Sequence, residues 1–350
     1  MLTNKDYIAN QLKARKSVIA ERTFEARKAI NTNMEKRYRE KDIPKFYADC
    51  SFHVDFLSQA ISYESPVIFT DYLLWTKRLF QHLPISSQSL VDFFHTFAVI
   101  VSSEVDPEHQ YGLKQYMDTA MLKFHEPLCE TTSFLDTSSP YGILSSNVLA
   151  LLLAGDKDKA TNYILDMVQS GTSIRDCYIN IIQPLQYEVG RLWHEGKISV
   201  GQEHYVTAAS QVVMSQFYSA IMDHPDNHKR IVSACISGEQ HEVGLRMVSD
   251  LMELEGWDTM FLGANTPLET IPETTLAWKA DLLAISVTLA IHLDKLSELI
   301  KLCRVQIPHL KVMVGGYPFN LDPELWRKIG ADGFANNALN AISTAESLIS

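Results

Sequence analysis

The segment 237–244 places a single histidine between a carboxylate and a glycine, in the order Glu239-x-His241-x-x-Gly244. Imidazole is the commonest metal ligand in proteins, and a carboxylate on one ring nitrogen fixes which nitrogen faces the metal. Gly244 has no side chain, so a bulky group can approach the backbone there. The motif therefore predicts a histidine ligand oriented by Glu239 or, as the plainer alternative, a histidine on a surface loop.

The residues from 230 onward predict the framework that positions this histidine. Short apolar runs alternate with amphipathic segments, a pattern typical of a parallel sheet with helices on both faces. We expect strands at 231–236, 259–262, 282–287, 312–314 and 333–335. Ligands of such sheets bind beyond the carboxyl ends of the strands, so the loops after residues 236, 262, 287 and 314 are the expected binding loops.

A four-helix bundle is predicted before the sheet. Apolar residues recur at helical spacing over 143–154, 156–169, 173–194 and 199–222. Gly155, Gly171 and Gly196 stand where helices commonly end. Four helices with short joints are typical of a bundle.

The first 130 residues are predicted to be entirely helical. Amphipathic helices are expected within 4–40, followed by 45–61, 66–83 and 87–105, and by a helix that Asp106 caps and that runs to residue 124. A polar linker follows at 130–139. The expected fold is α plus α/β, with a helical domain at 1–130, a bundle at 140–222 and a Rossmann-like, flavodoxin-like sheet domain at 230–350.

The loops of the sheet domain resemble the cobalamin-binding domain of methionine synthase, methylmalonyl-CoA mutase and corrinoid proteins. The matching features are the His241 loop, Gly263–Pro267, Ser286-Val-Thr288-Leu and Gly315-Gly316. The resemblance implies that His241 binds cobalt from below in place of dimethylbenzimidazole. It also implies that the nucleotide tail threads past the glycines, within hydrogen-bonding reach of the Ser286 and Thr288 hydroxyls.

The bundle carries a second resemblance. Trp193-His194 is followed, nine residues after the tryptophan, by Glu203-His204. This spacing resembles the light-sensing, adenosylcobalamin-dependent CarH-type repressors. The resemblance implies that Trp193, Glu203 and His204 surround the adenosyl group, and that His194 becomes the upper cobalt ligand after light removes it.

The N-terminal region departs from that family, because it shows no winged helix-turn-helix. A helical domain joined to such a module resembles the photocobilins, which also bind biliverdin. Aromatic and polar residues that could line a bilin slot are Phe52, His53, Phe56, Phe69, Tyr72, Trp75, Arg78, His82, Phe93, Phe94 and His95. We single out His53, Trp75, Arg78 and His82, although each has a plainer interpretation as a core or surface residue. Cys50 or Cys129 could form a thioether, but nothing in the sequence marks either as reactive.

Composition narrows the classes of function. With 31 basic and 42 acidic residues the net charge is −11, which disfavours direct binding to nucleic acid or anionic lipid. Five cysteines without a Cys-x-x-Cys pair indicate a reducing cytoplasm, and no apolar run is long enough for a membrane span. Of the twelve histidines, we expect most, including His292 and His309, at helix surfaces or ends.

The sequence thus predicts a non-enzymatic cytoplasmic light sensor that binds adenosylcobalamin and biliverdin. Photolysis would exchange cobalt ligands and change a homo-oligomer, with the signal passing to a protein rather than to DNA. The alternatives are a corrinoid methyl carrier of a methyltransferase system and a cobalamin sensor that does not respond to light.

Overall fold

The computed structural model describes residues 4–30, 42–83, 85–221 and 226–350. The chain divides into two compact units, residues 1–128 and 129–350. Residues 31–40 of the predicted N-terminal helices lie outside the described residues. No helix in the described part of the chain has the length and apolarity needed to cross a bilayer.

The regular secondary structure in the described residues of the first unit is entirely helical. Its helices are α1 (Asn4–Ala14), α2 (Lys16–Ile30), α4 (Ile43–Ser62), α5 (Pro66–Phe80), α6 (Ser87–Ser103) and α7 (Gln110–His125). Glu104 at the end of α6 is buried and pairs with Arg15 and Arg22, which fastens the joint between α1 and α2 to α6. The prediction that Asp106 caps α7 is wrong: His109 is the N-cap, and the Asp106 carboxylate accepts hydrogen bonds from Tyr7 and Gln11 instead.

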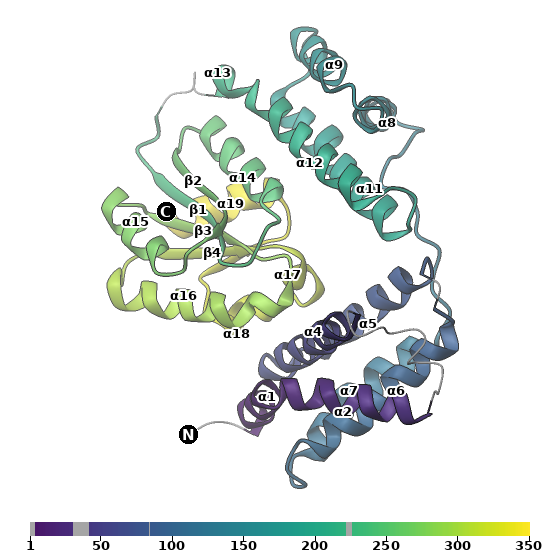
Figure 1. The fold of residues 1–350 in the computed structure, drawn as a ribbon. Coiled ribbons are helices and arrows are strands. Elements are labelled where there is room, and N and C mark those ends of the chain that lie inside the picture. Colours follow the sequence, from purple (N-terminus) through teal and green to yellow (C-terminus); the bar gives the residue numbers. More distant parts are fainter. Residues whose placement is uncertain (1–3, 31–41, 84, 222–225) are drawn as a thin grey trace. The chain divides into compact units, whose positions relative to one another are not determined.

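The second unit begins with the helices predicted as a four-helix bundle, which we call the cap (Figure 1). Its elements are α8 (Pro140–Leu153), α9 (Lys157–Gln169), α10 (Ile174–Asp176), the π-helix η2 (Cys177–Ile182), α11 (Gln183–His194), α12 (Val200–Ser215) and α13 (Tyr218–Ile221). Gly155, Gly171 and Gly196 have φ of 80°, 102° and 67°, the left-handed conformation that ends a helix. Ser139 and Ser199 accept hydrogen bonds from backbone N–H groups three residues later, which starts α8 and α12.

Two of the predicted cap helices are interrupted. The segment 173–194 contains a π-helical turn, because Pro184 has no N–H to donate to the carbonyl of Asn180. The segment 199–222 breaks after Ser215 and continues as the short helix α13.

A five-stranded parallel sheet completes the second unit. Its strands are β1 (Arg230–Ile236), β2 (Asp258–Thr266), β3 (Leu282–Ser286), β4 (Lys311–Gly315) and β5 (Gly333–Ala335), in the spatial order β2-β1-β3-β4-β5. All four pairings are parallel. The predicted loop from Gly263 is largely strand instead, because the β1–β2 register shifts after Ser233 and pairing continues to Thr266.

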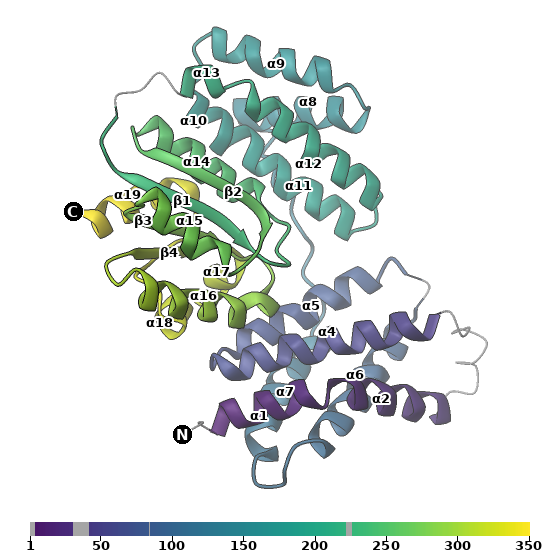
Figure 2. The same ribbon diagram turned by 60° about the vertical axis from the view of Figure 1, so that its left-hand side comes forward.

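Helices cover both faces of the sheet (Figures 1 and 2). They are α14 (Val243–Leu254), α15 (Thr270–Trp278), the 3₁₀ turn η3 (Ala290–His292), α16 (Leu293–Gln306), α17 (Tyr317–Leu321), α18 (Leu325–Ile329) and α19 (Ala338–Ile349). Helix α14 packs beside α19, and α15 packs beside α16. One hydrophobic core joins the cap to this domain, and in it the buried Tyr178 of η2 donates a hydrogen bond of 2.6 Å to Asp250 of α14.

Candidate functional site

The His241 loop follows β1 at the carboxyl edge of the sheet. The Glu239 side chain is fully buried, and its Oε1 lies 2.5 Å from His241 Nδ1. Its Oε2 accepts hydrogen bonds from the backbone N–H groups of Thr288 (2.7 Å) and Leu289 (3.0 Å). The carboxylate therefore connects the loop after β1 to the loop after β3.

Hydrogen bonds and nearby charges shift the pKa values of both members of this pair. Burial alone would raise the pKa of Glu239, but hydrogen bonds from His241 and from backbone amides lower it to about 2. The hydrogen bond to Glu239 raises the pKa of His241, and the charge of Glu203 adds to that effect. With Nδ1 donating to Glu239, Nε2 is the nitrogen that can bind a metal, on a side chain that is 55% exposed.

Two glycines of the binding loops, Gly244 and Gly316, have different structural roles. A Cβ added at Gly244 would meet no described heavy atom within 4 Å, so the backbone at the start of α14 is open to a large group. Gly316 has φ of 107°, and a Cβ there would lie 2.0 Å from the carbonyl oxygen of Val287. Gly316 is therefore required by the close approach of the loops after β3 and β4. Ser286 pairs with Gly315 at the ends of these two strands.

We predict that Gly316→Ala strongly destabilises the second unit. A strained positive φ costs about 1–3 kcal/mol by itself, and the collision with Val287 adds to it, so the free energy of unfolding falls by about 3 kcal/mol or more. Urea unfolding followed by circular dichroism measures the loss. Gly190→Ala is the matched control, because Gly190 lies within α11 with no described atom near its added Cβ. Equal midpoints for the wild type and Gly316→Ala would contradict the prediction.

The residues predicted above the cofactor lie at the junction of α11 and α12. Trp193 and His194 form the last turn of α11, with ring centroids 6.2 Å apart. Glu203 lies in the first turn of α12, where its Oε2 is 2.5 Å from Nδ1 of the exposed His204. Thr207 also donates to Glu203, at 3.2 Å.

A polar link between the cap and the sheet domain was not predicted. Glu242, directly after the candidate ligand, accepts hydrogen bonds from Gln211 of α12 (3.2 Å) and from the backbone N–H of Ala264 in β2 (2.7 Å). Arg246 of α14 donates to Ser215 of α12 at 2.9 Å. No sequence signal marks these partners, because they are separated by more than twenty residues and none belongs to a recognisable motif.

The candidate bilin residues all lie in the first unit. His53 of α4 is buried, its Nδ1 lies 2.7 Å from the Tyr72 hydroxyl, and burial lowers its pKa to about 3, so the imidazole is neutral. Trp75 of α5 is 39% exposed and its ring is nearly parallel to that of Tyr72. Arg78 lies in the last turn of α5, and His82 follows the helix and is exposed.

Two further residues proposed as bilin lining lie in the core. Phe69 and Phe94 are fully buried and contact other aromatic rings. Cys50 is buried, which raises the pKa of its thiol, whereas Cys129 is exposed.

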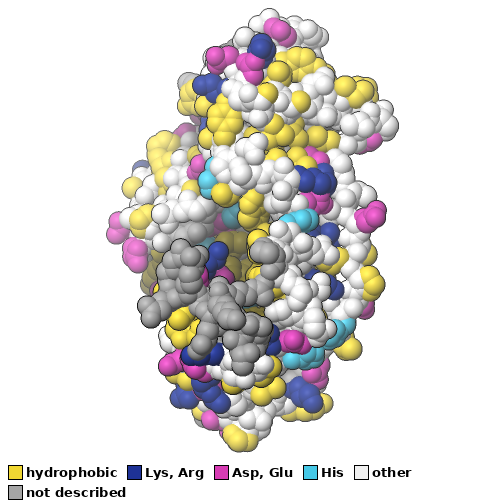
Figure 3. All heavy atoms as spheres, turned by 45° about the vertical axis from the view of Figure 1, so that its right-hand side comes forward, with side chains coloured by type: hydrophobic (Ala, Val, Ile, Leu, Met, Phe, Trp, Pro, Cys, Tyr) yellow, Lys and Arg dark blue, Asp and Glu magenta, His cyan; other side chains and the backbone are white. Residues whose placement is uncertain are grey.

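Histidines are scattered over the visible surface and do not form one patch (Figure 3). His292 lies at a helix end, as expected: it is the last residue of η3 and the N-cap of α16. It is 6% exposed and lies behind Gly238, because the loop after β3 folds under the loop after β1.

A parallel sheet with a carboxylate-oriented imidazole at its carboxyl edge, joined to a helical cap, is the arrangement that the resemblance to cobalamin-binding domains predicts. The comparisons with known proteins agree. Residues 229–343 match the family described as a B12 binding domain, and residues 145–218 match a second family of the same description. The chain is therefore a cobalamin-binding protein, with both matched segments in its second unit.

Two kinds of curated relative are similar to this chain. The HTH-type transcriptional repressor CarH of Myxococcus xanthus is 28% identical over 172 residues, which cover 49% of this chain and 56% of the repressor. Dimethylamine corrinoid protein 1 of Methanosarcina mazei is 26% identical over 214 residues, which cover 59% of this chain and 92% of that protein. The chain thus matches little more than half of the repressor's length.

A solved structure supports the fold. The monomethylamine corrinoid protein of Methanosarcina barkeri aligns with a TM-score of 0.52 at 19% identity, over 59% of this chain and 96% of that one. The likeness confirms the predicted cap and Rossmann-like sheet domain.

Proposed function

We propose that this protein is a light sensor whose chromophore is adenosylcobalamin. The observation that carries the proposal is the junction of α11 and α12. It presents Trp193, His194, Glu203 and His204 within twelve residues of the chain, at the end of α11 and the start of α12, in the same unit as the His241 loop. A methyl carrier needs one oriented imidazole below cobalt, and the second set of polar and aromatic groups is surplus to that role.

The proposal assigns each of these residues a role in binding the cofactor or in the response to light. His241 would hold cobalt through Nε2, and Glu239 would keep the ring of His241 oriented. Trp193, Glu203 and His204 would enclose the adenosyl group. The bound cofactor would supply a cobalt–carbon bond that visible light can break. His194 would then be available as a second imidazole ligand, and a movement of the cap helices would change the populations of two protein states.

We further propose that the first unit binds biliverdin. A row of rings supports this: Phe56 stacks on Tyr72 with centroids 3.8 Å apart and planes 5° apart, and Tyr72 is followed by the half-exposed Trp75. Arg78 and His82 lie beyond Trp75 and offer cationic or hydrogen-bonding groups for the bilin propionates. The proposed output is a light-dependent change of a homo-oligomer that a protein partner detects.

One absorption experiment tests these proposals. Protein is loaded in the dark with adenosylcobalamin and biliverdin, gel-filtered, and measured before and after green light. We expect a cobalamin spectrum that changes permanently on illumination, together with a red-absorbing bilin band that co-elutes with the protein. Bound adenosylcobalamin that photolyses at the rate of the free compound and leaves no new protein-bound spectrum would contradict the light-sensing role. Loss of the bilin on gel filtration would contradict only the bilin proposal.

A corrinoid methyl carrier is the second candidate. It is favoured by the match that covers 92% of a dimethylamine corrinoid protein. Competition between methylcobalamin and adenosylcobalamin separates the two functions, because the proposed upper pocket gives adenosylcobalamin the higher affinity. Preference for methylcobalamin would support the carrier.

A further inference from the structure

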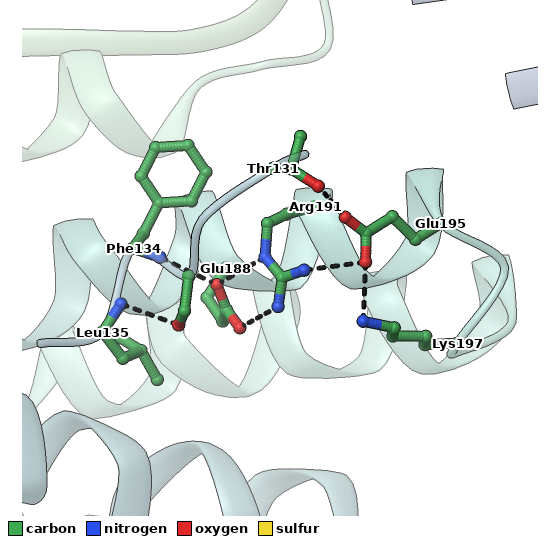
Figure 4. Close-up of polar contacts among 8 residues, drawn as sticks. Thr131, Phe134, Leu135, Glu188, Arg191, Glu195 and Lys197 are labelled. Atoms are coloured by element: carbon green, nitrogen blue, oxygen red, sulfur yellow. Dashed lines mark hydrogen bonds and ion pairs between the residues drawn. The ribbon is translucent and has the colours of Figure 1, made fainter. Parts of the chain in front are cut away.

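The segment that joins the two units is fastened to helix α11. We name residues 131–135 the strap. The strap's Phe134 donates its backbone N–H to Glu188 Oε2 (3.0 Å), and the Thr131 hydroxyl donates to Glu195. Arg191 lies between the two carboxylates and pairs with both, at 2.5 Å from Glu188 and 2.7 Å from Glu195 (Figure 4).

These contacts are shielded from water. The side chains of Glu188, Arg191 and Glu195 are 7%, 11% and 12% exposed. Burial alone would raise the pKa of Glu195, but hydrogen bonds from Lys197, Thr131 and Arg191 lower it to about 2. Charge-assisted hydrogen bonds in such surroundings are strong and directional. The strap is therefore held in one position as long as α11 keeps its geometry.

We call the contacts of Glu188, Arg191 and Glu195 with the strap the clamp. The clamp lies next to His194, the proposed upper ligand. Glu195 is the C-cap of α11 and directly follows His194, while Arg191 precedes Trp193 by two residues. Any displacement of the last turn of α11 that carries His194 also carries Glu195. Because hydrogen bonds weaken steeply when they are lengthened or bent, a small displacement alters the bond to Thr131.

The strap also contacts the boundary between the cap and the sheet domain. The Phe134 ring lies 5.4 Å from the Tyr187 ring of α11. Both line a mostly apolar cavity of about 350 Å³, whose other walls include Ile179 of η2 and Asn337 and Leu339 at the start of α19. The position of Phe134 thus depends on helices from both parts of the second unit.

We propose that the strap transmits the state of the upper cobalamin ligand to residues 1–128. The last turn of α11 holds the strap while the adenosyl group is present, and releases Thr131 when His194 takes the upper position. The strap begins three residues after the first unit ends at Leu128, so its release changes the tether of that unit. This inference rests on the proposed function of His194.

A spin label on Cys129 measures the strap directly. Cys129 is exposed, whereas Cys50, Cys177, Cys235 and Cys303 are buried, so a nitroxide reagent labels the full-length native chain selectively. Electron paramagnetic resonance spectra are compared for protein loaded in the dark with adenosylcobalamin and with hydroxocobalamin. We expect a shift toward a faster-moving label in the hydroxocobalamin form.

Variants test the clamp itself. Thr131→Val and Glu195→Gln are expected to give the faster label in both cobalamin forms while the absorption of the bound adenosylcobalamin stays unchanged. The control is Glu255→Gln, whose carboxylate pairs with Arg175 elsewhere in the same unit and which is expected to behave as wild type. A wild-type label that is equally mobile, or slower, with hydroxocobalamin overturns the inference, whereas a new protein-bound spectrum after green light on the adenosylcobalamin form still upholds the proposed function. Absence of cobalamin after gel filtration overturns both.

Discussion

Replacing His241 by alanine is expected to abolish tight cobalamin binding. Loss of a group that only orients a metal ligand costs roughly 10–100-fold in affinity, and the ligand itself accounts for more, so we expect a loss of at least about 100-fold. The free protein is expected to unfold at a somewhat lower urea concentration, because the fully buried Glu239 carboxylate loses its hydrogen bond from the His241 ring. Titration with hydroxocobalamin, followed by the absorption of the protein-bound fraction, measures the affinity.

Two further variants define what that result means. His309→Ala removes an exposed histidine of the same domain and is expected to bind as wild type. Glu239→Gln is expected to give an intermediate affinity, because Oε1 and Oε2 together accept bonds from His241, Thr288 and Leu289 and an amide offers only one acceptor oxygen. A His241→Ala protein whose bound cobalamin has the wild-type spectrum and affinity would show that another residue holds cobalt.

Local spacing explains why the core of this site could be predicted. Glu239 and His241 are two residues apart in a tight loop, so the carboxylate reaches the ring whatever the rest of the chain does. The glycines that end the cap helices and the alternation of strands and helices are also local signals, and they predicted the cap and the sheet domain.

The remaining features depend on long-range packing. Phe134 meets Glu188 across 54 residues and Gln211 meets Glu242 across 31, and neither pairing leaves a periodic signal in the sequence. The burial of His292 likewise follows from two loops that meet only when β1 and β3 pair. A helix through Pro184 was predicted, but the π-helical turn before it was not, because the position of a proline does not specify which distortion of the helix results.

The two ends of the proposed site differ in how firmly they are held, and this difference suits a switch. Below, Glu239 anchors His241 through a fully buried carboxylate that bridges two loops of the sheet. At the proposed upper position, His194 is the last residue of α11 and lies two residues before Gly196, which has a left-handed φ. Helix ends open at a lower free-energy cost than sheet cores. Under the proposed function, exchange of the upper ligand would require movement of only one helical turn, while His241 would stay in place.

Replacing His194 by alanine is expected to separate photolysis from capture of the light product. Adenosylcobalamin should bind in the dark with nearly wild-type affinity, because His241 and the Trp193, Glu203 and His204 side chains remain. Green light should still remove the adenosyl group, but the stable spectrum of a second imidazole ligand should be absent and the product should resemble protein-bound hydroxocobalamin. The decisive measurement is the difference spectrum after illumination, together with the fraction of cobalamin retained on gel filtration.

Added imidazole provides a control for this prediction, because it is expected to change the spectrum of the variant and not that of the wild type. Imidazole added to illuminated His194→Ala protein can occupy the emptied upper position and is expected to restore the two-imidazole spectrum, whereas it should leave the illuminated wild type unchanged. His204→Ala serves as the neighbouring comparison: its ring is already paired with Glu203, so the light product should form as in the wild type even if dark binding of adenosylcobalamin weakens. Should His204→Ala rather than His194→Ala abolish the two-imidazole product, the upper ligand lies at the start of α12, and the proposed path from His194 through Glu195 to the strap is wrong.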